Sequence, residues 1–283
     1  MKPIYLLRYY MPRFLNSEIF VIYVFFCSLN NKNICLRFIK LVYFMSIEDW
    51  EGTSLIIGAG GIGNQLSERL KLISPKLDVI LCGRKLSSKE GINLDLESDD
   101  SLSSFERQIS LCEKPLRLVI NSSGFLHSDL IKPEKRLSHL SRSNIIKNFS
   151  INSIAPILIA KSIERFIRPE LPFLFASLSA RVGSISDNKL GGWYSYRASK
   201  AAQNQFLKTL SIEWRRKFPY SIVSILHPGT CDTKLSKPYQ SNVPKEKLFS
   251  PARSAEYLIN ILSRQKISDS GKFLAWDSSK IPW

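Results

Sequence analysis

The stretch Thr53-Ser-Leu-Ile-Ile-Gly58-Ala-Gly60-Gly61-Ile-Gly63 decides the fold of this chain. Residues 53–57 form a short apolar run suited to a strand, and an amphipathic helical pattern covers residues 62–73. Between them the glycines follow the pattern G-x-G-x-x-G. A strand, a glycine turn and a helix in this order form the context in which such a turn binds a dinucleotide.

Each glycine of the turn has a separate reason to be there. Gly58 permits a tight turn, Gly60 lets the backbone approach a pyrophosphate, and Gly63 allows close packing of helix on strand. The start of the helix then offers free N–H groups to the phosphates. We therefore predict that the dinucleotide is bound by Gly58, Gly60, Gly61, Ile62 and Gly63.

The end of the next predicted strand indicates which nucleotide is preferred. Sites that bind NAD usually place an acidic residue there for the ribose 2′-hydroxyl. This chain instead has Arg84 and Lys85, directly after Cys82-Gly83. A guanidinium at this point suits a 2′-phosphate. We therefore expect NADP(H) to be preferred over NAD(H), the alternative being that Arg84 and Lys85 are surface cations.

Strands and helices alternate along the rest of the chain. Apolar runs predict strands at 77–82, 116–120, 173–176 and 222–226. Helical patterns cover 141–167, 196–218 and about 251–263, the last opened by Ser250 or Pro251. This alternation predicts an α/β fold: one doubly wound, Rossmann-type parallel sheet with helices on both faces, in a single domain over residues 45–283.

Residues 1–44 form a basic, hydrophobic extension that differs from the rest. Its longest apolar stretch, Ile19 to Leu29, has 11 residues, which is too short for a spanning helix of about 20. Three interpretations remain open for it. Met45 is the true start of the protein, or the segment is a targeting or membrane-associated element, or it is a structured addition.

Composition excludes several classes of protein. The chain of 283 residues carries 40 Lys and Arg against 24 Asp and Glu, a net charge of +16. These cations are scattered, so we expect no nucleic-acid partner. Five cysteines without a C-x-x-C pair, and three histidines without ligand spacing, predict neither a disulfide framework nor a metal site. A reducing, cytoplasmic location fits this cysteine content.

Tyr196-Arg-Ala-Ser-Lys200 is the strongest catalytic candidate. Residues four apart share a helix face, so the phenol and the ammonium are expected to be neighbours. A nearby ammonium favours the phenolate and lowers the pKa of the tyrosine, which suits acid–base work. Tyr194 has no such partner, because residue 198 is alanine.

Together these residues resemble the short-chain dehydrogenase/reductase family over about residues 53–276. The motifs that carry the resemblance follow the family's order: the glycine turn, Asn121-Ser-Ser-Gly124, Asn152, Ser179, Tyr196 with Lys200, and Pro228-Gly229. Within the family, the segments 178–188, 191–200, 227–233 and 273–276 look similar to the C-factor branch of cell–cell signalling proteins.

The resemblance implies roles for individual residues. Tyr196 would exchange a proton with the substrate oxygen, and Lys200 would lower its pKa and bind the nicotinamide ribose. Ser179 would hydrogen-bond the substrate oxygen, and Asn152 would hold a water of a proton relay. The remaining implied cofactor contacts are Asp95 near the adenine, Asn121 and Gly124 beside the cofactor, Pro228 and Gly229 in a turn, and Thr233 at the carboxamide.

Three departures from the family's pattern bear on these roles. The glycine turn is one residue tighter than the usual G-x-x-x-G-x-G. Asn121-Ser-Ser-Gly124 replaces the commoner Asn-Asn-Ala-Gly. The spacing of Ser179 and Tyr196 is about four residues longer than usual, so Ser177 and Ser184 remain alternatives for the serine.

The resemblance implies an NADP(H)-dependent oxidoreductase that transfers a hydride between the nicotinamide and a carbonyl or secondary alcohol. A homodimer or homotetramer is implied as well. Two rival interpretations stay open: a C-factor-like signalling or nucleotide-binding protein with little turnover, and a membrane-bound reductase anchored by residues 1–44. Residues 234–250 occupy the usual position of a mobile substrate loop, and an exposed connector is the alternative.

Overall fold

The computed structural model describes residues 23–24, 39–40, 46–87, 89, 91–241 and 243–283. The chain separates into two compact units, Met1–Met45 and Ser46–Trp283. In the first unit, β1 (Tyr23–Val24) pairs antiparallel with β2 (Ile39–Lys40). The interpretations of residues 1–44 otherwise fall outside the described residues. Among the residues described, no helix has the length and apolar character needed to cross a bilayer.

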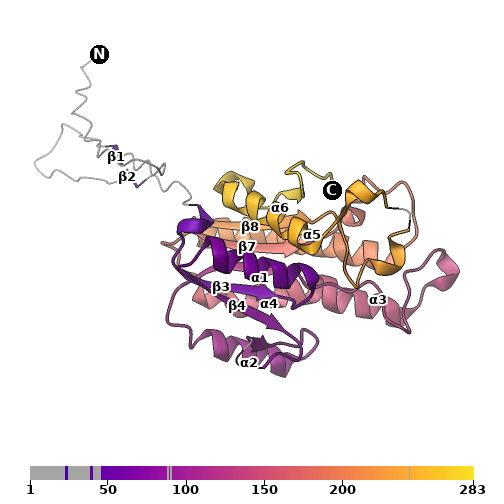
Figure 1. Cartoon of the computed structure of the whole chain (residues 1–283), viewed down its shortest axis with the longest axis horizontal. Helices are drawn as coiled ribbons and strands as arrows, with labels where there is room; N and C mark the ends of the chain where they lie inside the picture. Colours follow the sequence, from indigo (N-terminus) through magenta and orange to yellow (C-terminus); the bar gives the residue numbers. More distant parts are fainter. Residues whose placement is uncertain (1–22, 25–38, 41–45, 88, 90, 242) are drawn as a thin grey trace, which may run out of the picture. The chain divides into compact units, whose positions relative to one another are not determined.

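The second unit is built on one parallel sheet (Figure 1). The strand order is β11-β8-β7-β6-β3-β4-β5, so the chain crosses over between β5 and β6. The strands are β3 (Gly52–Ile57), β4 (Leu77–Gly83), β5 (Ile92–Asn93), β6 (Leu116–Asn121), β7 (Phe173–Leu178), β8 (Ser221–His227) and β11 (Phe273–Ala275). Every residue of β3, β6 and β7 is buried, as expected for parallel strands covered on both faces.

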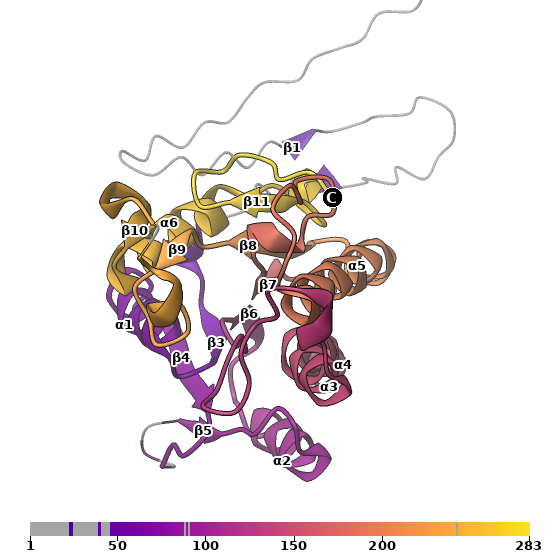
Figure 2. The ribbon, with the colours of Figure 1, turned by 90° about the vertical axis from the view of Figure 1, so that its right-hand side faces the viewer.

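Helices cover both faces of this sheet (Figure 2). On one face, α1 packs against α6, and on the other α5 packs against α3 and α4, with α2 beside α4. The helices are α1 (Gly61–Ile73), α2 (Asp99–Ile109), α3 (Arg142–Phe149), α4 (Ala155–Ile163), α5 (Tyr194–Lys217) and α6 (Pro251–Arg264). This arrangement confirms the predicted doubly wound, Rossmann-type fold in a single domain.

Large aromatic side chains fill the space between the sheet and α5. Trp214 of α5 is fully buried, and its ring meets Phe173 and Phe175 of β7 edge-on, each at 5.8 Å between ring centroids. Phe218 closes the end of the helix at 5.9 Å from the same indole. Such edge-to-face contacts add to the burial of the rings, and they hold the long helix firmly on the sheet.

Two helical regions differ from the sequence-based expectation. α2 was not predicted, although Ser98 caps it, two acidic residues open it, and Leu102, Phe105 and Ile109 form its buried face. The predicted helix 141–167 is continuous but changes pitch. A π-helical turn, Ser150–Ile154, separates α3 from α4. Such turns widen the helix locally and often occur at functional sites.

Register brings the ends of the central strands to one edge of the sheet. Ile57 pairs with both Cys82 and Asn121, Asn121 pairs with Ser177, and Leu178 pairs with Leu226. The residues that follow these strands therefore gather at the carboxyl edge. Ligands of open α/β sheets bind at that edge.

Candidate active site

The glycine turn joins β3 to α1 at this edge. Gly58 has a φ of 103°, a conformation that side-chain-bearing residues rarely adopt. A Cβ on Gly63 would lie 1.8 Å from the Gly58 carbonyl oxygen, whereas a Cβ on Gly60 would meet nothing within 4 Å. Gly63 is thus required by packing inside the protein. The backbone at Gly60 is open to a ligand.

Residues from the C-terminal part of the chain, Thr233 and Pro251, lie beside the rest of the turn. A Cβ on Gly61 would lie 3.1 Å from Thr233 Cγ2 and 3.4 Å from Pro251 Cγ. Ile62, the next residue, is partly buried. The structure therefore brings Thr233 to the start of α1, where the cofactor phosphates are predicted to lie.

Gly229 explains the bend that leads to Thr233. Its φ is 78°, and a Cβ there would lie 2.5 Å from the Phe249 ring and 3.2 Å from Trp276 Cδ1. Pro228, before it, is half-buried, and its carbonyl accepts from Ser254 Oγ at 3.3 Å. Both residues shape the turn after β8. Their predicted contact with the cofactor remains a prediction.

The end of β4 lies against the glycine turn. A Cβ on Gly83 would lie 2.8 Å from the Cβ of Ala59, so only a small residue fits between them. Arg84 and Lys85 follow directly and are exposed. Lys85 has a φ of 62°, and its N–H donates to Asn93 Oδ1 at 2.9 Å. The two cations therefore flank the turn from the side of β4.

Asp95 lies further along the same side. It is exposed, and its Oδ1 accepts from the N–H of Glu97 at 3.1 Å. This bond shapes the approach to α2. The carboxylate is otherwise accessible to solvent, as a group near an adenine would need to be.

Asn121 ends β6 and holds the middle of the edge. Its Nδ2 donates to Ser177 Oγ at 2.9 Å, and its Oδ1 accepts from Ser123 Oγ at 2.6 Å. Asn121 is fully buried, so these bonds tie the end of β6 to β7 and to the loop that follows β6. The segment it supports reaches Gly124, where a Cβ would lie 3.7 Å from Asn152 Oδ1 and 4.0 Å from Lys200 Nζ.

Asn152 is held within the π-helical turn. It is fully buried, its Oδ1 accepts from the N–H of Phe125, and its Nδ2 donates to the Phe125 carbonyl, both at 2.8 Å. These two bonds tie the helix to the loop after β6. Asn152, Gly124 and Lys200 thus lie close to one another, and the water held by Asn152 stays a prediction.

Tyr196 and Lys200 lie on the first turns of α5, and both are buried. Burial raises the pKa of the Tyr196 phenol, which is opposite to the lowering expected from a neighbouring ammonium. The Lys200 ammonium instead donates to the Leu178 carbonyl and to Gln203 Oε1, each at 2.9 Å. Burial also lowers the pKa of Lys200 to about 7, which weakens its effect as a cation near neutral pH.

The three candidate serines have different surroundings. Ser177 Oγ accepts from Asn121 and from Gln203 Nε2 inside the sheet, and Ser184 Oγ accepts from the N–H of Asp187 in a turn. Ser179 follows β7, next to the carbonyl that binds Lys200, and its Oγ donates to Asn204 Oδ1 at 2.6 Å. All three serines are buried and hydrogen-bonded, so the choice of Ser179 stays a prediction.

Aromatic rings form a wall beside Tyr196. The Trp193 ring lies 6.1 Å from that of Tyr196 and 5.1 Å from that of Tyr239. His127 completes the group at 5.7 Å from Tyr239, and its Nε2 lies 3.1 Å from the Leu235 carbonyl oxygen. Segment 234–250, the predicted substrate loop, therefore reaches the site through Tyr239.

Sequence reasoning missed three side chains that support the predicted ones. Gln203 and Asn204 contact Lys200 and Ser179 respectively, and buried Glu134 accepts from the N–H of Ser195 at 3.2 Å. Gln203 and Asn204 lie one helical turn after Lys200. Their spacing therefore places them on the same helix face as Lys200 and could have identified them. Glu134 lies in a loop, and no local pattern marks it.

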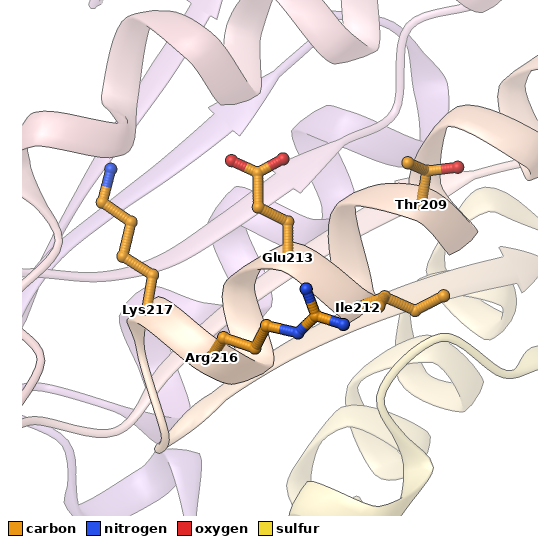
Figure 3. Close-up of a pocket in the computed structure, with 5 residues that line it drawn as sticks. All are labelled: Thr209, Ile212, Glu213, Arg216 and Lys217. Atoms are coloured by element: carbon orange, nitrogen blue, oxygen red, sulfur yellow. The ribbon is translucent and has the colours of Figure 1, made fainter.

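A separate surface hollow of about 530 Å³ lies on the second half of α5 (Figure 3). Side chains from the helix surface line it: Thr209, Ile212, Glu213, Arg216 and Lys217. At 1.5 Å per residue, its nearest member lies about 20 Å along the helix from Tyr196. The hollow is therefore not part of the candidate active site.

Comparisons with known proteins identify the family of the chain. The sequence profile of the short chain dehydrogenase family matches residues 53–244. C-signal of Myxococcus xanthus is 26% identical over 175 residues, covering 62% of this chain and 96% of C-signal. The 1-hydroxy-2-glutathionyl-2-methyl-3-butene dehydrogenase of Rhodococcus sp. (strain AD45) is 25% identical over 243 residues, covering 82% and 99%.

Solved structures share the fold. The NADPH-bound carbonyl reductase from chicken fatty liver superimposes with a TM-score of 0.71 at 23% identity, covering 82% of this chain and 99% of that one. The carbonyl reductase Sniffer of D. melanogaster gives 0.70 at 20% identity, covering 83% and 100%. At these identities the likeness concerns the fold alone.

Proposed function

Since the chain belongs to the short-chain dehydrogenase family of oxidoreductases, we propose that it reduces a carbonyl compound with NADPH, or oxidises the corresponding secondary alcohol with NADP⁺. The observation that carries this proposal is the meeting of Gly124, Asn152 and Lys200. Tyr196 lies one turn before Lys200 on α5. All four lie at the carboxyl edge that also carries the glycine turn.

The residues of the edge fit a dinucleotide. Open backbone at Gly60 and the first N–H groups of α1 suit a pyrophosphate. Arg84 and Lys85 suit a 2′-phosphate, which supports a preference for NADP(H). When bound, a nicotinamide supplies hydride chemistry to a carbonyl carbon. The protein's part is to orient the reactants and to move the proton.

Tyr196 is the proposed proton donor to the carbonyl oxygen. A phenol is protonated at neutral pH, as a donor must be, and burial raises the pKa of Tyr196 further. We propose that Ser179 hydrogen-bonds the same oxygen and that Lys200 binds the nicotinamide ribose. Release of Lys200 from Leu178 and Gln203 would supply the donors for that ribose.

The test is NADPH oxidation by the purified full chain with a panel of aliphatic, aromatic and quinone carbonyl compounds. Tyr196→Phe should lower kcat by a factor of about 10³ while leaving NADPH affinity unchanged. Tyr194→Phe is the matched control, because Tyr194 lies on the same helix turn and is 42% exposed. If Tyr196→Phe keeps most of the activity, the proposed mechanism is wrong.

The similarity to C-signal favours a second candidate function, that of a signalling or nucleotide-binding protein with little turnover. The same panel separates the two candidates. NADPH binding without reduction of any carbonyl compound would favour the second. Rapid turnover of one of them would remove it.

We also propose that the protein forms a homodimer or homotetramer and lies in the cytoplasm. Apolar side chains on α3 and α5 are exposed, with Ile146 at 57%, Phe206 at 41% and Ile212 at 46%, which supports a homodimer or homotetramer. Unpaired Cys82, Cys112 and Cys231 support a cytoplasmic location. Light scattering and fractionation of cells that make the full chain test these points.

A further inference from the structure

Glu134 is a buried carboxylate next to the candidate active site, with only 1% of its surface exposed. It accepts hydrogen bonds from the N–H of Ser195 at 3.2 Å, from Ser195 Oγ and from Asn144 Nδ2. Its backbone carbonyl also accepts from the N–H of Trp193 at 2.5 Å. A buried carboxylate is costly unless donors surround it. Here those donors come from the start of α5 and from α3.

A ladder of asparagines leads from Glu134 to Asn152. Asn148 Nδ2 donates to Asn144 Oδ1 at 2.7 Å, and Asn152 Nδ2 donates to Asn148 Oδ1 at 3.3 Å. All three carboxamides are buried, at 5%, 1% and 0% exposure. Each donates toward Glu134, so the asparagine ladder, Asn144–Asn148–Asn152, runs in one direction. It ends at a carboxylate, which can only accept.

The ladder closes into a ring through α5. Ser199 Oγ is a third acceptor for Asn152 Nδ2, at 3.0 Å, so two N–H groups are shared among three acceptors. Ser199 Oγ in turn donates to the Tyr196 carbonyl at 2.8 Å. Ser195, which binds Glu134, directly precedes Tyr196. The ring therefore holds Tyr196 from both sides. It also includes the carboxamide of Asn152.

The direction of the ladder matters at Asn152. With its present orientation, the Oδ1 accepts from the Phe125 N–H and the Nδ2 donates to the Phe125 carbonyl. A reversed carboxamide would place donor against donor and acceptor against acceptor. Reversal at Asn144 or Asn148 would therefore conflict with the bonds that Asn152 makes.

We propose that Glu134 is a positioning residue for the proposed reaction. As the carboxylate that terminates the ladder, it accepts the last bond in the direction that the Phe125 backbone fixes at Asn152, and it holds the first turn of α5, which carries Tyr196. The inference rests on the proposed function, because Tyr196 and Asn152 are placed by it in the proton-transfer machinery. The hydrogen-bond network around Glu134 also has a readout that needs no turnover, the amide exchange of the segments it holds.

The decisive variant is Glu134→Gln, which keeps the shape but replaces one acceptor oxygen by a donor. We expect kcat for carbonyl reduction to fall about 10- to 100-fold, because small misplacements of reacting groups have effects of this size. KM for NADPH should stay close to that of the wild type, and the thermal midpoint should fall by a few degrees at most, because one buried donor loses its acceptor. Glu106→Gln is the control. Glu106 lies on α2, where it forms an ion pair with Arg165 at 3.1 Å and makes no bond to the ladder.

Moving the carboxylate one step along the ladder should restore function. In the double variant Glu134→Gln/Asn144→Asp, the new amide can donate to the new carboxylate, and Asn148 again meets an acceptor. We expect this variant to recover most of the lost kcat. Asn144→Asp alone should do worse than the double variant, because it places two buried carboxylates side by side.

Amide hydrogen exchange gives the readout that does not depend on turnover. Glu134→Gln should speed exchange in the segments 148–155 and 193–200, and the double variant should restore their protection. An unchanged kcat in Glu134→Gln, or a double variant no better than the single one, would overturn the proposal. If the wild type reduces no carbonyl compound, the proposed function fails, and unchanged exchange in Glu134→Gln would then overturn the ladder as well.

Discussion

Two halves of the carboxyl edge are built in different ways. The nucleotide half, Gly58–Gly63 with Arg84, consists of backbone, glycines and an exposed cation. The catalytic half, which contains Asn152, Ser179, Tyr196 and Lys200, consists of buried polar side chains joined by hydrogen bonds. The nucleotide half depends on glycines, which have no side chain. The second depends on partners brought from distant parts of the chain.

This difference predicts that the two halves fail differently when changed. The nucleotide half should respond to added volume, because its close approaches leave no room for a methyl group. The catalytic half should respond to protonation and to loss of donors or acceptors, because buried polar groups are costly without partners.

The largest effect is expected in the nucleotide half. Gly63→Ala places a methyl group 1.8 Å from the Gly58 carbonyl oxygen. Helix and turn must then move apart, so the free energy of unfolding should fall by about 3 kcal/mol. Urea unfolding measures this change.

Gly60→Ala is the matched comparison, because a Cβ there meets nothing within 4 Å. The free energy of unfolding should change by about 1 kcal/mol or less, as expected for an alanine at a helix cap. Fluorescence titration should nevertheless show weaker NADPH binding. Equal stability of Gly63→Ala and Gly60→Ala would contradict the description of this half.

An intermediate effect is expected in the catalytic half. Burial lowers the pKa of Lys200 to about 7, against about 10.4 for an unperturbed lysine. Between these values the unfolded chain binds more protons than the folded chain, so stability rises with pH. From about pH 7 to about pH 8.5, the free energy of unfolding should rise by about 1.5 kcal/mol.

Urea unfolding without added nucleotide, at several pH values, tests this slope. Lys200→Met should remove most of it, since the variant has no proton to lose there. The same slope in Lys200→Met and in the wild type would show that Lys200 is not its source. Gly60→Ala should keep the wild-type slope, because the nucleotide half contributes no buried titrating group.

The smallest effect is expected at the exposed rim of the nucleotide half. Arg84→Ala should weaken NADPH binding about tenfold, the value of one charge-assisted hydrogen bond. NADH binding and stability should stay unchanged, because the side chain is exposed. Arg69→Ala serves as the control, because Arg69 is also exposed but lies on α1. An equal loss of NADPH and NADH affinity would contradict the assignment of the 2′-phosphate to Arg84.

The same contrast explains what the sequence could predict. The strand, turn and helix around Gly58–Gly63 are local, so their pattern identified the fold. The five strands predicted from runs rich in apolar residues are confirmed to within two residues at each end, whereas the short strands β5 and β11 were not predicted. α2 was missed, since only three of its eleven residues are apolar and the other eight are polar.

The catalytic half was predictable only in part. Tyr196 and Lys200 share a local spacing, whereas Asn152 and Ser179 were assigned from resemblance. Glu134 reaches Ser195 across 61 residues of sequence, and Asn152 reaches Ser199 across 47. Pairings at such separations are set by tertiary packing, so local periodicity carries no signal for them. The raised pKa of Tyr196 was unforeseen for the same reason, because its cause is burial.

The π-helical turn Ser150–Ile154 has a consequence for the phase of the helix that contains it. On an α-helix, a step of four residues overshoots a full turn by about 40°, so side chains at such steps drift around the axis. A wider turn takes back part of that drift. Asn152 thereby stays in line with Asn144 and Asn148. Deleting one residue from this turn would rotate Ala155–Ile163 by about 100° relative to α3. Ile159 and Ile163 would then leave the core. The wider turn thus fixes two orientations on the helix. It keeps the asparagines of the ladder in line, and it keeps the apolar side chains of α4 turned toward the core.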